Sequence, residues 1–533
     1  MPYVVTQSCC SDAACVVACP VNAIHPAPGE PGFATTEMLY VDPETCVDCG
    51  ACAPACPVGA LLPDSKLPES QLAFARINAE YYERNPHAGR PPLALVNRDR
   101  ELPAGPVRVA VIGAGPAGLY AADELLRHRG VSVDVFDRLP TPHGLARYGV
   151  APDHTETRRV LDLFAKIENE AGFRYRLNVE AGNGVTHAEL REAYHAVVYA
   201  TGAATDRSLG LEGEDLPGSV SATDFVAWYN GHPDSGGVSY PLRSSRAVII
   251  GNGNVALDVA RVLTADPGKL AATDIAGDAL LALRASEIRE VLILGRRGPA
   301  EAAFTLPELV GLASIEDVDI VVEGDVRVTS EKTEILAELA RREPRPGARR
   351  IVLRFNTAPV RMLGSDAVTG LEVSATRVTA GRAVLTGSLE VLETGLVLRA
   401  IGYRALPVPG LPFDEERAVV PSDGGRVEPG VYVTGWIKRG PTGFLGTNKS
   451  CAKETVGRLL DDLGDGVLSE PTTTLERRDG EISGRQWRAI DAAARSEQVA
   501  GPGVRRQHDS LVRPVRRQHD PDRLGEKLRK LLR

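Results

Sequence analysis

The sequence predicts an α/β protein in which a small cysteine-rich α+β domain precedes two larger domains built from parallel βα units. Three observations predict this. Eight of the nine cysteines lie before residue 57. Two glycine-rich turns, at 113–118 and 251–256, each follow a short apolar run and precede a helical pattern. The 533 residues, 43% of them hydrophobic, suffice for roughly two to four domains.

Composition and charge exclude some classes of protein. No apolar run approaches about 18 residues, so we expect no membrane span. The N-terminus MPYVVTQSCC lacks the features of a secretory signal, so we expect a cytoplasmic protein, where clustered cysteines bind metal more often than they form disulfides. The net charge is −9, with no Lys or Arg in residues 1–65 and a basic tail at the other end. This pattern does not favour nucleic-acid binding.

The stretch CVDCGACAPACP has the cysteine spacing of an iron–sulfur site. In the two-cluster arrangement the first three cysteines, Cys46, Cys49 and Cys52, bind one cluster, and the fourth, Cys56, which precedes a proline, binds the other. Zinc sites favour separated cysteine pairs, and disulfides are rare in the cytoplasm. The spacing therefore predicts iron–sulfur clusters.

An earlier run supplies the partner site. The earlier run contains Cys9, Cys15 and Cys19. Each lies 37 residues before a cysteine of the later run, and the flanking sequences CPVNAI and CPVGAL are also similar. We predict one 4Fe-4S cluster bound by the later triplet and Cys19, and a second cluster bound by Cys9, Cys15 and Cys56. Asp12 stands where the second cluster lacks a thiol, and Cys10 lies nearby. This cluster is either 3Fe-4S, which we favour, or a labile 4Fe-4S that uses Asp12 or Cys10.

The first glycine-rich turn contains Gly113, Gly115 and Gly118 and follows the predicted strand 107–112. Such glycines let backbone N–H groups approach a pyrophosphate at a helix N-terminus. The next predicted strand ends in Asp137, an acid that can accept a hydrogen bond from a ribose hydroxyl. This unit predicts a Rossmann-like site for a dinucleotide with a free ribose, such as FAD.

The second glycine-rich turn contains Gly251 and Gly253 and has Ala256 at the third position. The next predicted strand ends in Arg296 and Arg297 instead of an acid. Two arginines would pair with a 2′-phosphate that an acid would repel. We therefore predict NADPH at this site.

Three later segments indicate a flavin module divided in sequence. The runs 196–203 and 396–404 each pass from an apolar strand into a glycine turn. The segment 431–446 passes from a strand into a glycine-rich turn that could lay backbone amides against a flavin ring. The flavin module therefore lies on both sides of the nicotinamide unit.

Four motifs carry a family resemblance: RLPTPHGLARYGVAPDH, GNGNVALDVAR, GRRGPAEAAFTLPEL and GWIKRGPTGFLGTNK. With them, residues 107 to about 495 resemble the adrenodoxin-reductase type of ferredoxin–NADP reductase. Residues 1–65 resemble bacterial two-cluster ferredoxins. The whole chain resembles the actinobacterial form in which a ferredoxin is fused ahead of the reductase.

The expected fold class is α/β, with two Rossmann-like dinucleotide-binding domains, the NADP domain inserted in the FAD domain, preceded by a small α+β two-cluster ferredoxin domain. The expected boundaries follow in chain order: ferredoxin domain 1–65, linker 66–106, FAD domain 107–205 and 395–495, NADP domain 206–394, and a basic tail, 496–533, expected to be disordered.

The resemblance also implies site residues. The FAD contacts it implies are Ala117, Asp137, Leu145, Ala181, Trp436, Gly443, Phe444 and Leu445. The NADP contacts it implies are Arg207, Asn252, Gly253, Asn254, Val255, Arg296, Arg297 and Glu308, with Gly443 shared. His154 would lie near the flavin, and we take His154 and Glu308 as candidate catalytic residues. Gly311 stands where the family often carries an acid, so a relay of two glutamates is not supported.

The implied activity is electron transfer between NADPH, FAD and the iron–sulfur clusters, in either direction. The expected partners are NADPH and redox proteins such as ferredoxins or haem monooxygenases. An NADPH-oxidising module of a larger complex, similar to the glutamate synthase small subunit, is the alternative. A disulfide reductase would need a cysteine pair beside the flavin, and the reductase part has only Cys451. A non-enzymatic cluster-binding protein would not explain two nucleotide sites.

Overall fold

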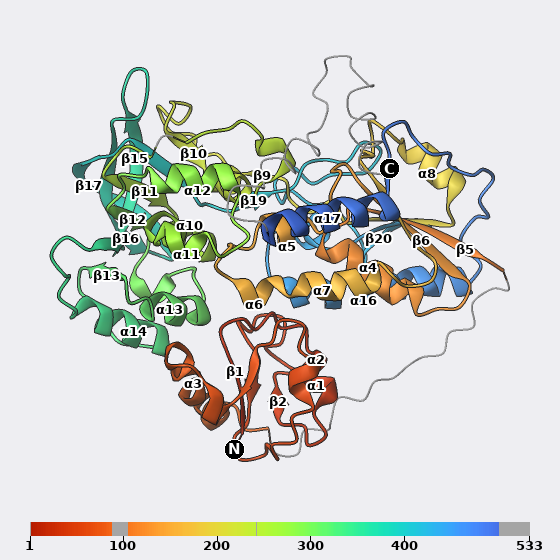
Figure 1. Ribbon diagram of the computed structural model, residues 1–533, viewed down its shortest axis with the longest axis horizontal. Helices are drawn as coiled ribbons and strands as arrows, with labels where there is room; N and C mark the ends of the chain where they lie inside the picture. The colour runs from red at the N-terminus through yellow and green to blue at the C-terminus, as the bar shows by residue number, and fades with distance from the viewer. Residues whose placement is uncertain (1, 88–104, 241, 500–533) are drawn as a thin grey trace.

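The computed structural model describes residues 2–87, 105–240 and 242–499. They form a small N-terminal domain that lies beneath two α/β domains, drawn in red at the bottom of Figure 1. In the described part of the chain, no helix has the length and apolar character needed to cross a bilayer.

The larger α/β domain is built on a seven-stranded sheet in the order β20-β21-β8-β5-β6-β7-β22. Its inner strands are parallel and almost wholly buried, as expected when helices cover both faces. The strands are β5 (Val107–Ile112), β6 (Val131–Asp137), β7 (Phe173–Leu177), β8 (Ala196–Tyr199), β20 (Arg426–Glu428), β21 (Val431–Val433) and β22 (Ile482–Ser483). The helices are α4 (Pro116–Leu126), α5 (Gly144–Tyr148), α6 (Thr155–Arg158), α7 (Val160–Ile167), α8 (His187–Ala193), α15 (Trp436–Arg439), α16 (Leu445–Gly464) and α17 (Gly484–Val499).

The second α/β domain has a six-stranded parallel sheet in the order β10-β18-β11-β12-β14-β13. Its strands are β10 (Ser219–Ser221), β11 (Arg246–Ile250), β12 (Glu290–Leu294), β13 (Val318–Glu323), β14 (Arg349–Arg354) and β18 (Leu396–Arg399). An antiparallel sheet of β15 (Thr357–Leu363), β16 (Gly370–Thr379) and β17 (Arg382–Glu393) adjoins it. The helices are α9 (Ala222–Tyr229), α10 (Asn254–Thr264), α11 (Pro267–Leu270), α12 (Gly277–Arg284), α13 (Leu306–Ala313) and α14 (Glu331–Ala340).

The chain crosses between these two domains twice. It leaves the seven-stranded sheet after β8, builds the six-stranded sheet, and returns to add β20 and β21. The outgoing strand β9 (Thr205–Asp206) pairs with the returning strand β19 (Tyr403–Arg404). The predicted fold class, with one dinucleotide-binding domain inserted in the other, is confirmed.

The N-terminal domain has an internal repeat. Strand β1 (Tyr3–Val5) pairs with β4 (Leu61–Pro63), and β2 (Ile24–His25) pairs with β3 (Tyr40–Val41). Two short helices, α1 (Ala14–Ala18) and α2 (Cys52–Ala55), each end at a cysteine with extended backbone, Cys19 and Cys56. These two cysteines occupy equivalent places in the repeat.

The predicted linker 66–106 is wrong in its first part. Residues 73–84 form α3 (Ala73–Arg84), whose Phe74 and Ile77 are buried in the core of the N-terminal domain. The side chain of Asn78 accepts hydrogen bonds from the backbone N–H of Val5 (3.1 Å) and of Val41 (2.8 Å). The spacing of Phe74 and Ile77, three residues apart, is a helical signal that the linker prediction overlooked.

Two other predictions fall at or beyond the edge of the described chain. The rest of the predicted linker, 88–104, lies outside the described residues, and so does the predicted tail from 500 onward. Within the described part, α17 continues to Val499, so the start of that predicted tail is helical.

Candidate functional site

The first glycine-rich turn has the geometry that a phosphate-binding turn requires. Gly113 has φ +111°, and a Cβ there would lie 2.4 Å from the carbonyl oxygen of Ala200. A Cβ on Gly118 would lie 1.9 Å from the carbonyl oxygen of Gly113. Helix α4 starts immediately after Gly115, so its unpaired N–H groups are presented at the turn.

Asp137 lies at the end of β6 and holds this turn. Its carboxylate accepts hydrogen bonds from the backbone N–H of Ala114 (2.8 Å) and of Leu139 (2.9 Å). Burial raises the pKa of this carboxyl group, although both hydrogen bonds oppose the shift. The predicted contact with a ribose would use the remaining lone pairs of these oxygens and stays a prediction.

The second glycine-rich turn repeats this geometry. Gly251 has φ +108°, and a Cβ there would lie 2.3 Å from the carbonyl oxygen of Ala400. Asn254, at the start of α10, accepts a hydrogen bond from the N–H of Thr305 at 2.9 Å, which ties the turn to the segment before α13. Arg296 and Arg297 follow β12 with exposed side chains. They are available to a charged group approaching this edge of the sheet.

The residues implied for FAD lie on several elements of the larger domain. Ala117 is on α4, and a Cβ on Gly435 would lie 2.5 Å from the Cβ of Ala117. Trp436 begins α15, and its indole N–H donates to the carbonyl oxygen of Thr442 at 3.2 Å. The turn 443–445 leads into α16, which packs against α4. These segments therefore converge beside the first glycine-rich turn.

Three other implied residues lie around this group. Leu145 is on α5 next to Gly144, where a Cβ would lie 3.0 Å from the Cα of Gly115. Ala181 packs with the same apolar cluster as Trp436. Arg207 is exposed just after β9, at the first crossing between the domains.

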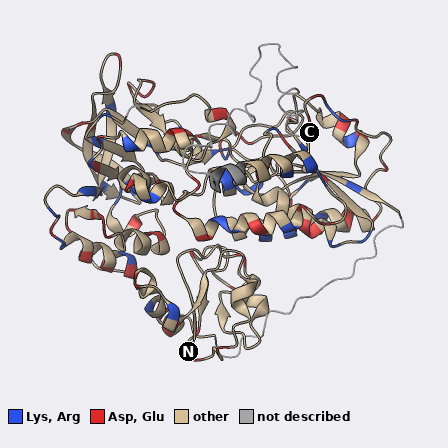
Figure 2. Ribbon diagram, in the orientation of Figure 1, with Lys and Arg blue, Asp and Glu red and all other residues tan. Residues whose placement is uncertain are grey.

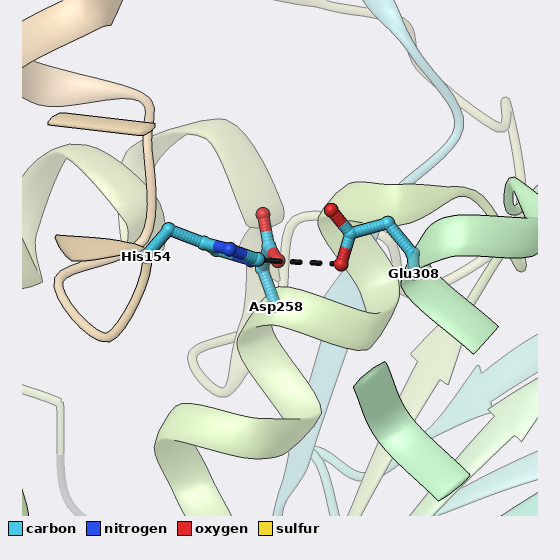
Figure 3. A group of neighbouring side chains, drawn as sticks. All are labelled: His154, Asp258 and Glu308. Atoms are coloured by element: carbon cyan, nitrogen blue, oxygen red, sulfur yellow. Dashed lines mark hydrogen bonds and ion pairs between the residues drawn. The ribbon is translucent and has the colours of Figure 1, made fainter. Parts of the chain in front are cut away.

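The two candidate catalytic residues meet between the α/β domains (Figure 3). His154, which precedes α6, has its Nε2 atom 3.5 Å from Oε2 of Glu308 on α13. The same nitrogen lies 3.1 Å from Oδ1 of Asp258 on α10. His154, Asp258 and Glu308 lie close enough together to hold a metal ion. The guanidinium group of Arg261 contacts all three side chains, so a cation is already supplied by the protein.

The surroundings raise the pKa of two groups in this cluster, His154 and Glu308. Burial and Arg261 lower the pKa of His154, but the hydrogen bond to Asp258 and the charges of Asp258 and Glu308 outweigh them, and the pKa is raised above 6.5. Burial raises the pKa of Glu308 above 4.5, against the opposing charges of His154 and Arg261. Both groups are therefore perturbed by their surroundings, as titratable groups at functional sites commonly are.

The cysteines of the N-terminal domain fall into two groups. The first group, which lines one small cavity, is Cys19, Cys46, Cys49 and Cys52. Cys19 thus joins the later triplet. The second group is Cys9, Cys15 and Cys56, of which Cys15 is buried and the other two are partly exposed. Burial and, more weakly, the charges of neighbouring thiols raise the pKa of Cys9 and of Cys15. The spacing predicted the same exchange of the fourth cysteine between the repeats, and cluster ligation by these residues stays a prediction.

The chemistry of these donors fits iron–sulfur clusters. Backbone N–H groups donate to Cys19 Sγ from Ala23 and to Cys56 Sγ from Ala60, each at 3.3 Å, so the repeat extends to the sulfur atoms. Burial raises the pKa of the Cys9 thiol to about 11, so the free thiol is protonated and cluster binding must release the proton.

The candidate fourth ligands, Asp12 and Cys10, both face the larger α/β domain. Asp12, whose side chain is 5% exposed, forms an ion pair with Lys449 on α16 at 3.0 Å. The carbonyl oxygen of Cys10 accepts a hydrogen bond from the N–H of Gly446 at 2.8 Å. The loop that carries the second thiol group therefore packs directly on the turn at 443–446.

Four residues of these sites were not predicted from the sequence: Asp258, Arg261, Lys449, and Gln7, whose Nε2 lies 3.5 Å from Oε2 of Glu308. The first two lie in the motif GNGNVALDVAR, three residues apart on one face of α10, and that spacing was a usable signal. Gln7 and Lys449 act across domains, and nothing local in the sequence marks them.

Comparison with known proteins agrees with this architecture. Residues 107–442 match the pyridine nucleotide-disulphide oxidoreductase family, and residues 8–60 match the 4Fe-4S dicluster domain family. A probable ferredoxin/ferredoxin–NADP reductase of Mycobacterium tuberculosis is 52% identical, over 92% of this chain and 91% of the relative. NADPH:adrenodoxin oxidoreductase of Arabidopsis thaliana is 42% identical, over 73% of this chain and 90% of the relative.

A solved structure agrees as well. The structure of Mycobacterium tuberculosis FprA in complex with NADPH matches 76% of this chain and 99% of its own chain, with 41% identity and a TM-score of 0.71. By its sequence, its two-domain fold and its N-terminal cysteine domain, the chain belongs to the family of ferredoxin/ferredoxin–NADP reductases.

Proposed function

We propose that this enzyme is a ferredoxin–NADP reductase with its own ferredoxin, which moves electrons between NADPH, FAD and two iron–sulfur clusters. The observation that carries the proposal is the contact between the cysteine loop and the turn beside the first nucleotide site, Cys10 with Gly446 and Asp12 with Lys449. One group of thiols is thereby held next to the elements proposed to bind FAD.

The protein's own contribution is to bind and orient its cofactors. The glycine turn at 113–118 and Asp137 would hold FAD, and the turn at 251–256 with Arg296 and Arg297 would hold NADPH. Bound FAD supplies the ability to accept two electrons together and release them one at a time. His154 and Glu308 would face the reacting rings and fix the charge around them.

The cysteine groups support a cluster assignment. We assign a 4Fe-4S cluster to Cys19, Cys46, Cys49 and Cys52, which offer four thiols. We assign a 3Fe-4S cluster to Cys9, Cys15 and Cys56, because the ion pair of Asp12 with Lys449 engages the nearest carboxylate. Cys10 is 4% exposed and packs in the apolar core of the larger domain.

The exposed side of the N-terminal domain suggests the outlet. Cys49 is exposed, and the neighbouring Val47 is 59% exposed. Residues 2–65 contain acids and no Lys or Arg. In Figure 2 the blue segments of this domain that can be made out lie on α3. An acceptor with a basic surface, such as another ferredoxin or a haem monooxygenase, would fit this side. A cytoplasmic location fits clusters built on reduced thiols.

Anaerobic titration with NADPH, followed by absorbance and electron paramagnetic resonance, tests the proposal. We expect the flavin absorbance to bleach, and the oxidised protein to show a paramagnetic 3Fe-4S signal that disappears on reduction. Protein that stays colourless after anaerobic reconstitution of its iron and sulfide would contradict the proposal.

A further inference from the structure

Helix α13 of the nicotinamide domain is part of the contact with the N-terminal domain. Val310 is 4% exposed and packs in the apolar cluster of the N-terminal domain. The carboxylate of Glu37 accepts a hydrogen bond from the N–H of Leu306, at the start of the helix, at 2.6 Å. Ser314 Oγ donates to the carbonyl oxygen of Ser70 at 3.2 Å, just beyond the other end. The helix that carries Glu308 is therefore fixed along its length by the ferredoxin domain.

Gly311 lies inside this helix, where its backbone does not require glycine. Glycine in a helix costs stability relative to alanine, so its presence needs a reason in the packing. A Cβ at this position would lie 2.1 Å from Nε2 and 2.5 Å from Cδ of Gln7. The missing side chain is the space that the Gln7 amide occupies.

The Gln7 amide is held in a defined direction. Its Oε1 accepts from Nε2 of Gln71 at 3.4 Å, while its backbone N–H donates to Oε1 of Gln71 at 3.1 Å. Its Nε2 then faces Oε2 of Glu308 at 3.5 Å. The same oxygen lies 3.4 Å from Nη1 of Arg261 and 3.5 Å from Nε2 of His154. Each of the three domains therefore places one side-chain nitrogen within 3.5 Å of Oε2 of Glu308.

We propose that Gln7 is a positioning residue for Glu308. Because Gly311 has no side chain, the Gln7 amide can approach the Glu308 carboxylate. The docked ferredoxin domain thereby completes the nicotinamide site of its own reductase. This inference rests on the proposed function, because it takes Glu308 to lie in the NADP site. Since docking and NADP binding share one helix, each must affect the other by the same factor.

The test uses the full-length holoenzyme, oxidised, with NADP+ as the probe and the flavin absorbance change as the measure of binding. We expect Gly311→Ala to weaken NADP+ binding about tenfold, because the new methyl group displaces the Gln7 amide from a charged partner. Gly277→Ala is the matched control, since a Cβ on Gly277 meets no atom within 4 Å. In the double variant Gln7→Ala with Gly311→Ala, the new methyl group has room. The losses of NADP+ affinity in the two single variants should therefore not add in the double variant.

A pH series separates positioning from a merely structural effect. The charged groups that face Glu308 are His154, Asp153, Asp258 and Arg261. An amide donor favours the ionised form of Glu308, so Gln7→Leu should move the acid limb of the NADP+-binding profile to higher pH. Weakening by the same factor at every pH would overturn the proposal.

The remaining outcomes are also decisive. Equal NADP+ affinity in wild type, Gly311→Ala and Gln7→Leu would overturn the inference and leave the proposed function intact. A flavin-free wild type, or one that does not bind NADP+, would instead overturn the proposed function, and the inference with it.

Discussion

Arg296 and Arg297 follow shortly after β12, where the first unit has Asp137 as the last residue of β6. Both arginine side chains are exposed and make no demand on the fold, so their replacement tests ligand recognition alone. We expect Arg296→Ala with Arg297→Ala to raise KM for NADPH roughly 10- to 100-fold, because charge-assisted hydrogen bonds to a 2′-phosphate are lost. KM for NADH should change little. Arg284→Ala, exposed at the end of α12, is the control, and equal losses for both nucleotides would refute the site assignment.

His154 gives a prediction about pH. Its pKa is raised in the folded protein, chiefly through Asp258 and Glu308 against the cost of burial. A raised histidine pKa stabilises the fold fully below about 6.5, and this stabilisation disappears as pH rises through the folded value. We therefore expect His154→Gln to lower the unfolding temperature at pH 6 by a few degrees and to have little effect at pH 9. Thermal unfolding followed by circular dichroism at both pH values provides the check; an equal loss at both would exclude this account.

At the scale of elements, α16 begins at the turn 443–446 and contacts the loop of Cys10 and Asp12 through Lys449. Its partner Asp12 has 5% of its side chain exposed and Lys449 has 33%, so removing Lys449 leaves a mostly buried carboxylate without its cation, at a cost of about 1–3 kcal/mol. We expect Lys449→Met to slow reduction of the clusters by NADPH, while reduction of the flavin itself stays near the wild-type rate. Stopped-flow absorbance separates the two steps. Lys453→Met, on the exposed side of the same helix, should affect neither, and slowing of flavin reduction in Lys449→Met would argue for a general defect.

Helix α3 is the element that stabilises the small domain from outside the cysteine repeat. Asn78 is 2% exposed and satisfies two backbone N–H groups, one on β1 and one on β3. Asn78→Ala would leave both without a partner, which costs about 2–5 kcal/mol. We expect iron to be released at lower urea concentration than in wild type, with flavin still bound. Asn85→Ala, exposed at the end of the same helix, is the control. Simultaneous loss of iron and flavin would show that the domains unfold as one unit.

At the scale of the whole molecule, the ferredoxin domain contacts both α/β domains. Its Asp12 pairs with Lys449 on α16. Its Glu37 accepts a hydrogen bond from the start of α13, and Val310 of α13 packs in its apolar core. A partner held in this way does not have to be captured from solution, so transfer from flavin to clusters should not depend on protein concentration. The apolar contact of Val310 with the N-terminal domain does not depend on salt screening, and the ion pair of Asp12 with Lys449 is partly buried.

These contacts predict different salt dependences for two steps. Between about 50 mM and 500 mM NaCl, internal reduction of the clusters should change less than about twofold, because docking is already complete. Reduction of an added basic acceptor such as cytochrome c should fall severalfold, since it depends on electrostatic steering to the acidic outer side. Stopped-flow absorbance measures the first rate and steady-state cytochrome reduction the second. A steep salt dependence of the internal step would mean that the domain undocks during turnover.

The sequence by itself determined the local chemistry of this protein. The 37-residue repeat, the two glycine-rich turns and the acid or arginines that follow them predicted cysteine grouping and nucleotide units, because each depends on residues close together in the chain. Only the tertiary structure decided what these units do to one another. The partners of Asp12 and Gln7, at Lys449 and Glu308, are more than 300 residues away, and Arg261 satisfies side chains from three separate segments. Such contacts depend on how domains pack, which the spacing of residues along the chain does not encode locally.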